Sequence, residues 1–99
     1  MNKSQQVQTI TLAAAQQMAA AVEKKATEIN VAVVFSVVDR GGNTLLIQRM
    51  DEAFVSSCDI SGLPVIFNEQ VIGAVGVSGG TVEQDQLLAQ CALDCFSAL

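Results

Sequence analysis

The sequence predicts an α/β (α+β) fold in which two terminal helices flank an antiparallel sheet, in the order α-β-β-β-β-α. Apolar residues recur at intervals of three and four near both ends of the chain, which is the spacing of amphipathic helices. Four runs rich in β-branched residues lie between them, joined in two pairs by turn-forming residues. The length of 99 residues suits a single domain, which we expect to cover residues 1–99.

The first helix is predicted to begin after Thr11, whose hydroxyl can cap the first turn. Asn30 suits the left-handed backbone conformation that often follows a helix. Between them, the apolar stripe consists of Leu12, Ala15, Ala19, Val22, Ala26 and Ile29. Its alanines favour the helix and permit close approach to a sheet.

The first predicted strand, Val31 to Val38, is mostly apolar on both of its alternating faces. Such a strand needs cover on both faces of the sheet. Either the two helices lie on opposite faces, or another subunit closes one of them. The turn-forming segment Asp39 to Asn43 joins this strand to a second one, Thr44 to Met50, in a β-hairpin.

Residues 51–62 show no clear period and are interpreted as a loop. A third strand is predicted over Leu63 to Phe67, where Pro64 restricts it to an edge of the sheet or a strand start. A turn at Asn68 to Gln70 leads to the fourth strand, Val71 to Ser78, which gives a second hairpin.

The last helix is predicted to begin after Thr81, with Gln84 three residues later as in a capping box. Glu83 and Asp85 fall in its first turn, where carboxylates interact favourably with the helix dipole. We interpret them as capping charges rather than as an acid–base pair. The expected apolar stripe of this helix is Leu88, Cys91, Cys95 and Ala98.

Composition excludes several classes of function. The net charge is −5 and the basic residues are scattered, so neither a nucleic acid nor an anionic membrane surface is expected as a partner. The absence of histidine excludes His-based catalytic triads and imidazole metal ligands. No apolar run reaches the ~20 residues of a membrane span and the N-terminus does not resemble a signal peptide, so we expect a cytoplasmic protein. Only 15% of the residues are charged, which favours self-association as a homo-oligomer.

Four segments together resemble the GlcG/HbpS family, which includes the C-terminal domain of PduO-type proteins. They are Asn30 to Asn43, Gln48 to Asp51, Gly62 to Val65 and Gly76 to Gly80. The resemblance covers nearly the whole chain and is greatest to small stand-alone members encoded beside glycerol and propanediol dehydratase genes. It implies a profilin-like α/β sandwich, an oligomer, and haem or a corrinoid as ligand; haem degradation has been proposed for some members.

One departure from the family concerns the middle of the chain. Relatives carry further helices and a strand between the segment that ends at Asp51 and the one that begins at Gly62. Here residues 58–61 run almost directly into Gly62, so we expect a deletion seam near residues 61–62. The loss of a central strand leaves its neighbours to pair again or to expose their edges.

The junction of the fourth strand and the last helix is the main candidate binding site. Ser78, Gly79, Gly80 and Thr81 place backbone N–H groups at the positive end of a helix, where a carboxylate or a tetrapyrrole propionate could bind. The segment is not a P-loop, because no lysine follows the glycines, and no βαβ unit surrounds it. The alternative is a tight turn in which glycine serves only backbone geometry.

Arg49 and Met50 complete the set of candidate ligand-binding residues. Arg49 is expected to share a strand face with Leu45 and Ile47, and its guanidinium needs a carboxylate, which Asp39, another chain or a ligand can supply. A structural salt bridge is the simpler interpretation. Met50 and Cys58 are soft ligands near the same site, but without histidine we do not expect specific haem ligation.

Two other pairs of residues allow either packing or a ligand. Cys91 and Cys95 are four residues apart on one helix face, and two thiols alone make an incomplete metal site, so we expect core packing and predict no metal centre. Gly73 and Gly76 lie within a strand, which indicates that something packs closely there, and the alanines of the first helix are the favoured partner.

These observations support three functions in order. The first is a small-molecule binding or accessory domain, for which the family resemblance implies a tetrapyrrole or corrinoid. The second is a non-catalytic structural or oligomerising domain, or a shortened chain that folds without the activity of its full-length relatives. An enzyme ranks last, because no residue is a convincing general base or nucleophile.

Overall fold

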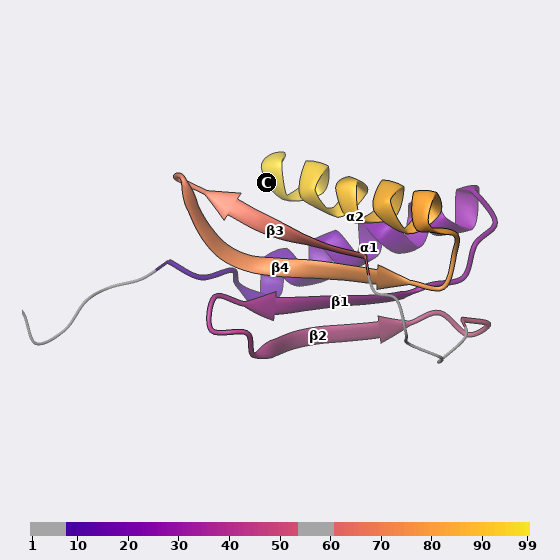
Figure 1. The fold of residues 1–99 in the computed structure, drawn as a ribbon, viewed down its shortest axis with the longest axis horizontal. Helices are drawn as coiled ribbons and strands as arrows, with labels where there is room; N and C mark the ends of the chain where they lie inside the picture. The colour runs from indigo at the N-terminus through magenta and orange to yellow at the C-terminus, as the bar shows by residue number, and fades with distance from the viewer. Residues whose placement is uncertain (1–7, 54–60) are drawn as a thin grey trace, which may run out of the picture.

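The computed structural model describes residues 8–53 and 61–99 and confirms the predicted order of elements. Its elements are α1 (Leu12–Glu28), β1 (Val34–Asp39), β2 (Thr44–Arg49), β3 (Ser61–Phe67), β4 (Gln70–Ser78) and α2 (Val82–Ser97). The strands form one antiparallel sheet in the order β2-β1-β4-β3 (Figure 1). β3 is an edge strand, as Pro64 predicted. No helix within the described ranges is long and apolar enough to cross a membrane.

Helix α1 begins and ends where its capping residues predicted. Thr11 Oγ1 accepts a hydrogen bond from a backbone N–H of the first turn at 3.2 Å. After the helix, Asn30 adopts a left-handed φ of 60°, and the Val31 N–H donates to the Ala26 carbonyl at 2.9 Å. Because this closing turn occupies the start of the apolar run, β1 begins at Val34 and not at the predicted Val31.

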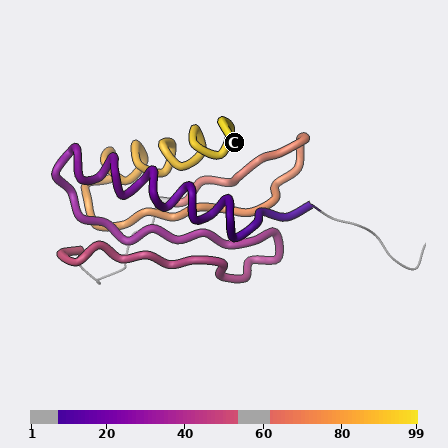
Figure 2. The backbone as a smooth tube through the Cα atoms, turned by 180° about the vertical axis from the view of Figure 1, so that it is seen from behind, coloured from indigo at the N-terminus to yellow at the C-terminus, as the bar shows by residue number. Residues whose placement is uncertain are grey.

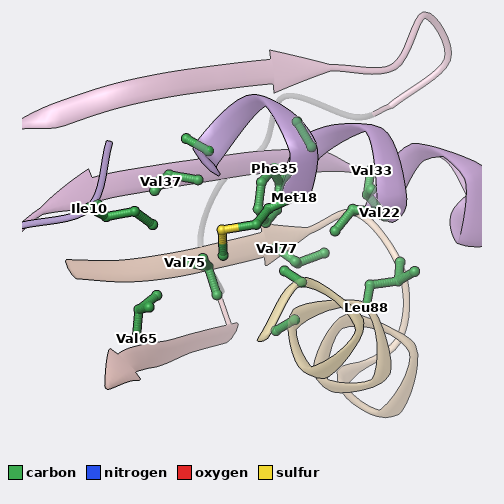
Figure 3. Close-up of a cluster of buried hydrophobic side chains, with 14 of the residues drawn as sticks. Ile10, Met18, Val22, Val33, Phe35, Val37, Val65, Val75, Val77 and Leu88 are labelled. Atoms are coloured by element: carbon green, nitrogen blue, oxygen red, sulfur yellow. The ribbon is translucent and has the colours of Figure 1, made fainter. Parts of the chain in front are cut away.

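Both helices pack on the same face of the sheet. α1 lies behind the strands in Figure 1 and in front of them in the reversed view of Figure 2, and it packs directly against α2. Side chains of both helices and of the facing strands form a single core (Figure 3). Its largest fully buried members are Phe35, Met18, Leu88, Val22, Val33, Val37, Val65, Val75 and Val77. Of the two predicted arrangements, the one with helices on opposite faces is therefore wrong.

The buried stripes of the helices differ from the predicted ones. In α1, Met18 joins the core and Leu12 is 48% exposed. The buried residues of α2 are Asp85, Leu88, Ala89 and Ala92, whereas Cys91 and Cys95 are half-buried and Ala98 is exposed. The alanines let α2 approach the sheet closely. The two cysteines face α1, and Cys95 also packs against the core from its side, as expected for this residue.

The strand register shows which residues share the face without helices. Directly paired residues of antiparallel neighbours point to the same side of a sheet. Opposite the helices, three rows cross the sheet: Arg49, Val34 and Ser78; Ile47, Ser36, Gly76 and Gly62; and Thr44, Val38, Ala74 and Pro64. We call the surface formed by these three rows the open face, because no helix of the described residues covers it.

Candidate functional site

The backbone groups of the predicted anion site at the start of α2 are bonded to side chains of the chain itself. The Gly80 N–H donates to Asp85 Oδ1 at 2.9 Å, and the Thr81 N–H donates to Gln84 Oε1 at 2.9 Å. The Gln84 N–H donates in turn to Thr81 Oγ1 at 3.1 Å, which completes the predicted capping box. A bound anion would have to displace these partners to use the same N–H groups.

Asp85 is a capping carboxylate in an apolar setting. The residue is only 4% exposed, and burial raises the pKa of its carboxyl group, partly offset by the hydrogen bond from the Gly80 N–H. Glu83, in the same helical turn, is exposed. The interpretation of both residues as first-turn capping charges is confirmed, with Asp85 making a direct bond to the turn that precedes the helix.

Two of the glycines in this region are required by neighbouring backbone. Gly79 has a φ of 128°, and a Cβ there would lie 2.6 Å from the Ala32 carbonyl oxygen. A Cβ on Gly73 would lie 2.5 Å from the Val38 carbonyl oxygen and 2.9 Å from Ile10 Cγ2. The prediction that Gly73 packs against the alanine face of α1 is therefore wrong. The closest side chain is that of Ile10, in the segment before that helix.

The register brings Arg49 and Ser78 to the same end of the open face. Both residues pair with Val34, one from each side, so their Cα atoms lie two strand spacings apart, about 10 Å. Ser78 is buried and Arg49 is exposed. Arg49 is the single charged residue in the three rows of the open face, so any charge recognition on this surface depends on it.

Arg49 has no carboxylate partner among the described residues. Its Nη1 donates to the Ala53 carbonyl at 3.4 Å, and the ion pair between Lys25 and Glu28 is the only one found in residues 8–53 and 61–99. Asp39 lies at the opposite end of β1, where its carboxylate accepts two N–H groups of its own turn at 2.9 Å each. A salt bridge to Asp39 is therefore wrong, and no other carboxylate of the described residues pairs with Arg49.

Met50 forms hydrogen bonds with the loop between α1 and β1. Its Sδ accepts a hydrogen bond from the Val33 N–H at 3.5 Å, and its own N–H donates to the Val33 carbonyl at 3.0 Å. The side chain is half-buried and packs against the core. Ligation of a metal by this sulfur would therefore cost a backbone hydrogen bond. Cys58, the other soft ligand that the sequence suggested, lies outside the described residues.

A groove of about 540 Å³ lies beside Arg49 and Met50. It is formed by the C-terminal part of α1, the following loop and the end of β2, and residues 78–81 do not line it. Sequence reasoning missed the contribution of α1, where Glu23 and Thr27 line the groove, and of Asn30 in the turn that follows. The spacing of four residues between Glu23 and Thr27 on the polar side of the helix was the available signal.

The charges that line this groove favour ligands that donate hydrogen bonds over ligands that carry negative charge. Three carboxylates line it, those of Glu23, Asp51 and Glu52, against the single guanidinium of Arg49. Glu23 Oε2 accepts a hydrogen bond from Gln48 Nε2 at 3.4 Å. A ligand with several negative groups would meet repulsion inside the groove, so one carboxylate placed at Arg49 from the open face is the anion that this region accommodates best.

Comparisons with known proteins match nearly the whole chain. The family model described as "Haem degrading protein HbpS-like" matches residues 10–61 and 62–94. An uncharacterized 15.0 kDa protein from the dhaT-dhaS intergenic region of Citrobacter freundii is 56% identical over 142 residues, an alignment that covers 100% of each chain.

Two solved structures share the fold. Protein ORFY of Klebsiella pneumoniae is 70% identical with a TM-score of 0.94, and the match covers 100% of this chain and 98% of that one. The crystal structure of a PduOC–haem complex is 22% identical with a TM-score of 0.81 and covers 88% of this chain and 94% of that one. At that identity the second likeness shows the fold alone. The predicted fold class is confirmed.

Proposed function

Because this chain belongs to the HbpS-like family of haem degrading proteins, we propose that it is a tetrapyrrole-binding or accessory domain that holds one ligand carboxylate at Arg49. The observation that carries the proposal is the isolation of Arg49. It is the single charge on a helix-free sheet face and has no acidic partner among the described residues. A guanidinium in this position suits a bidentate pair with a carboxylate.

The side chains of the open face support a planar ring as the rest of the ligand. The small residues Ser36, Ala74 and Gly62 of the two rows beyond Arg49 are at least partly exposed, so the accessible surface there is low and mostly apolar, while Gly76 among them is buried. Val34 and Val38 of β1 supply half-buried apolar contacts along the same face. Burial of such surface under a macrocycle contributes roughly 25 cal/mol per Å² of apolar area.

We do not propose that the chain ligates haem iron or degrades haem. The residues fit an axial ligand poorly: the sequence has no histidine, and Met50 Sδ already accepts the Val33 N–H. The thiols of Cys91 and Cys95 face α1 in the helix layer, on the other side of the sheet from the open face. The ligand is therefore held by its ring and its periphery.

Titration with haemin and with metal-free protoporphyrin IX, followed by visible absorption, tests the proposal. Both should bind with Kd values within about threefold of each other, because no described residue fits as a ligand of the iron. Arg49→Gln should weaken binding by about 10- to 100-fold, the equivalent of a charge-assisted hydrogen bond of roughly 1.5–3 kcal/mol. Arg40→Gln is the matched control, since Arg40 is exposed and donates to Gln70 at the far end of β1.

Hydroxocobalamin is the third ligand in this series. Its peripheral amides would suit the carboxylates of the groove, whereas the propionates of haemin suit Arg49. Binding of the cobalamin alone would assign the ligand to the corrinoids. No spectral change with any of the three ligands at micromolar protein would contradict the proposal, as would equal binding by Arg49→Gln and the unsubstituted protein.

The open face also favours a second candidate function, an oligomerising domain. β1 is apolar toward both faces, and Ile47 in the middle row is 65% exposed. A second copy over this face would bury these side chains and bring acids to Arg49, because Asp51 and Glu52 lie two and three residues after Arg49 in the chain. Two-fold symmetry places such a patch against itself.

Light scattering of the purified chain tests this second candidate. A dimer is expected, and Ile47→Lys should dissociate it by burying an unpaired charge in the interface. Leu99→Lys is the matched control, because Leu99 is equally exposed at 65% but lies at the C-terminus beyond α2. A monomer at every concentration would contradict the proposal.

We also propose that the chain is a shortened single domain with a deletion seam at residues 61–62. Two findings support it: the family match breaks at this junction, and the alignment with the Citrobacter freundii relative is longer than the 99 residues of this chain. The seam falls at the start of β3, and β2 and β3 occupy the two edges of the sheet. Activities of relatives that depend on a middle region are not expected here.

A further inference from the structure

Two thiols lie one helical turn apart in the seam between the helices. Cys91 Sγ is 3.8 Å from the carbonyl oxygen of Ala21, and Cys95 Sγ is 3.6 Å from that of Gln17. Residues 17 and 21 are themselves one turn apart on α1, so the two helices run antiparallel and both sulfurs lie on the same side of α2. This position is at the margin of the core, against which Cys95 packs, and on the other side of the sheet from Arg49.

Both thiols are available for chemistry. They are free and only half-buried. Residues four apart on a helix have Cβ atoms about 5–6 Å from each other, so rotation about χ1 can bring the sulfurs together. The contacts that this rotation would break are weak, because a thiol is a poor hydrogen-bond donor.

The number of ligands decides which metal ion the pair can hold. Zinc in structural sites takes four protein ligands, and no group of three or more His, Cys, Asp or Glu suited to a metal occurs within residues 8–53 and 61–99. Cu(I) is a soft ion that thiolates select, and two sulfurs in a linear arrangement complete its coordination. The geometry therefore matches a two-coordinate soft ion and not zinc.

We propose that Cys91 and Cys95 form a two-thiolate site for Cu(I) in the seam between α1 and α2. Each thiol releases one proton, two Cu–S bonds form, and the copper stays in the +1 state, so no oxidant or reductant takes part. The resulting complex carries one negative charge. Lys25 of α1 lies close enough to Cys91 to influence its ionisation and can offset that charge.

Charged groups of both helices lie near the Cys91 sulfur. Burial raises the pKa of the Cys91 thiol, and Cys95, Asp94 and Glu28 raise it further, while Lys25 lowers it.

Anaerobic titration of the reduced full chain with Cu(I), in competition with a bathocuproine chelator, tests the proposal through ultraviolet thiolate-to-copper absorption. One Cu(I) per chain is expected. Cys91→Ser and Cys95→Ser should each weaken binding by about 100-fold or more, since one thiolate cannot complete the site. Cys58→Ser is the matched control and should bind as the unsubstituted chain does. Full binding by the Cys91→Ser/Cys95→Ser double variant, or its loss in Cys58→Ser, would overturn the proposal.

A second measurement needs no substitution and so does not depend on the variants folding. Iodoacetamide labelling of the unsubstituted chain, read by mass spectrometry, reports each thiol separately. Cu(I) at one equivalent should protect Cys91 and Cys95 together and leave the labelling of Cys58 unchanged. Labelling of Cys91 or Cys95 at the metal-free rate would overturn the assignment.

Discussion

The candidate binding residues of this chain differ in whether their polar groups already have a partner within the protein. The N–H groups of Gly80 and Thr81 point where an anion could bind, but Asp85 and Gln84 already accept from them. Arg49 is the reverse case, a charged side chain with no acidic partner among the described residues. Arg49 is therefore a stronger candidate for ligand binding than the glycine turn.

Asp85 gives a pH-dependent prediction. Its folded-state pKa is raised above the ordinary value of 3.8, so the folded state binds the proton more tightly than the unfolded state does. The stability contribution of this group is therefore present below pH 3.8 and is lost as the pH rises through the folded-state pKa. Asp85→Asn keeps an acceptor for the Gly80 N–H but has no carboxyl group to ionise. Its free energy of unfolding, relative to that of the unsubstituted chain, should therefore increase from acid to neutral pH.

Urea unfolding across this pH range measures the effect. Asp85→Ala is the control, because it removes the capping acceptor and should lose about 1 kcal/mol. A stability difference between the Asn variant and the unsubstituted chain that does not change with pH, or that changes in the opposite direction, would show that the carboxyl group is not destabilised by burial.

Gly79 gives a second prediction at this scale. Alanine there would combine a φ of 128° with a Cβ 2.6 Å from the Ala32 carbonyl oxygen, so Gly79→Ala should lower the free energy of unfolding by about 1–3 kcal/mol. Gly62→Ala is the matched control, because among the described residues its Cβ would meet the Val75 carbonyl oxygen alone, at an ordinary 3.6 Å. Equal stability of the two variants in urea would contradict the role given to Gly79.

Local signals located the elements, and tertiary contacts decided how they face one another. The roles of Thr11, Asn30 and the Thr81–Gln84 capping box could be predicted, because each of these residues bonds to groups only a few residues away in the chain. The buried side of α2 could not be predicted, since Cys91 and Ala92 differ little in apolar character. The approach of α2 to the sheet, which no local pattern encodes, selected Ala92 for the core and left Cys91 in the helix seam.

Two neighbouring leucines of α2 test this orientation. Leu88 is fully buried between the helices and the sheet, whereas Leu87 is 46% exposed. Leu88→Ala should lower the free energy of unfolding by about 2–5 kcal/mol, the cost of lost burial and a cavity. Leu87→Ala should change it by about 0.5 kcal/mol or less, as exposed positions usually do. Similar losses in denaturant unfolding would contradict the placement of α2.

At the scale of the whole molecule, the two-sided apolar character of β1 is the feature that the sequence left unresolved. It required cover on both faces but did not say which layer would supply it. The structure places both helices on one side. The groove was equally unpredictable, because Glu23 of α1 and Gln48 of β2 meet only once the chain has folded.

Concentration should affect stability if a second copy covers the open face. Association of folded chains stabilises them by mass action, so the midpoint of thermal unfolding should rise with protein concentration. Ile47→Lys should remove that rise, and Leu99→Lys should preserve it. Calorimetry over a wide concentration range measures this, and a midpoint independent of concentration would argue against the oligomerising function while leaving ligand binding untouched.

The central claim is that the helix-free sheet face, with Arg49 at its end, is the functional surface of this domain. Amide NMR of the isotope-labelled chain during titration with protoporphyrin IX tests it most directly, because each residue reports its own contact. The account predicts chemical-shift changes at Val34, Ser36, Arg49 and Ser78, and little change at the helix-side residues Leu87 and Gln90. Changes confined to the helices, or none at all, would contradict it.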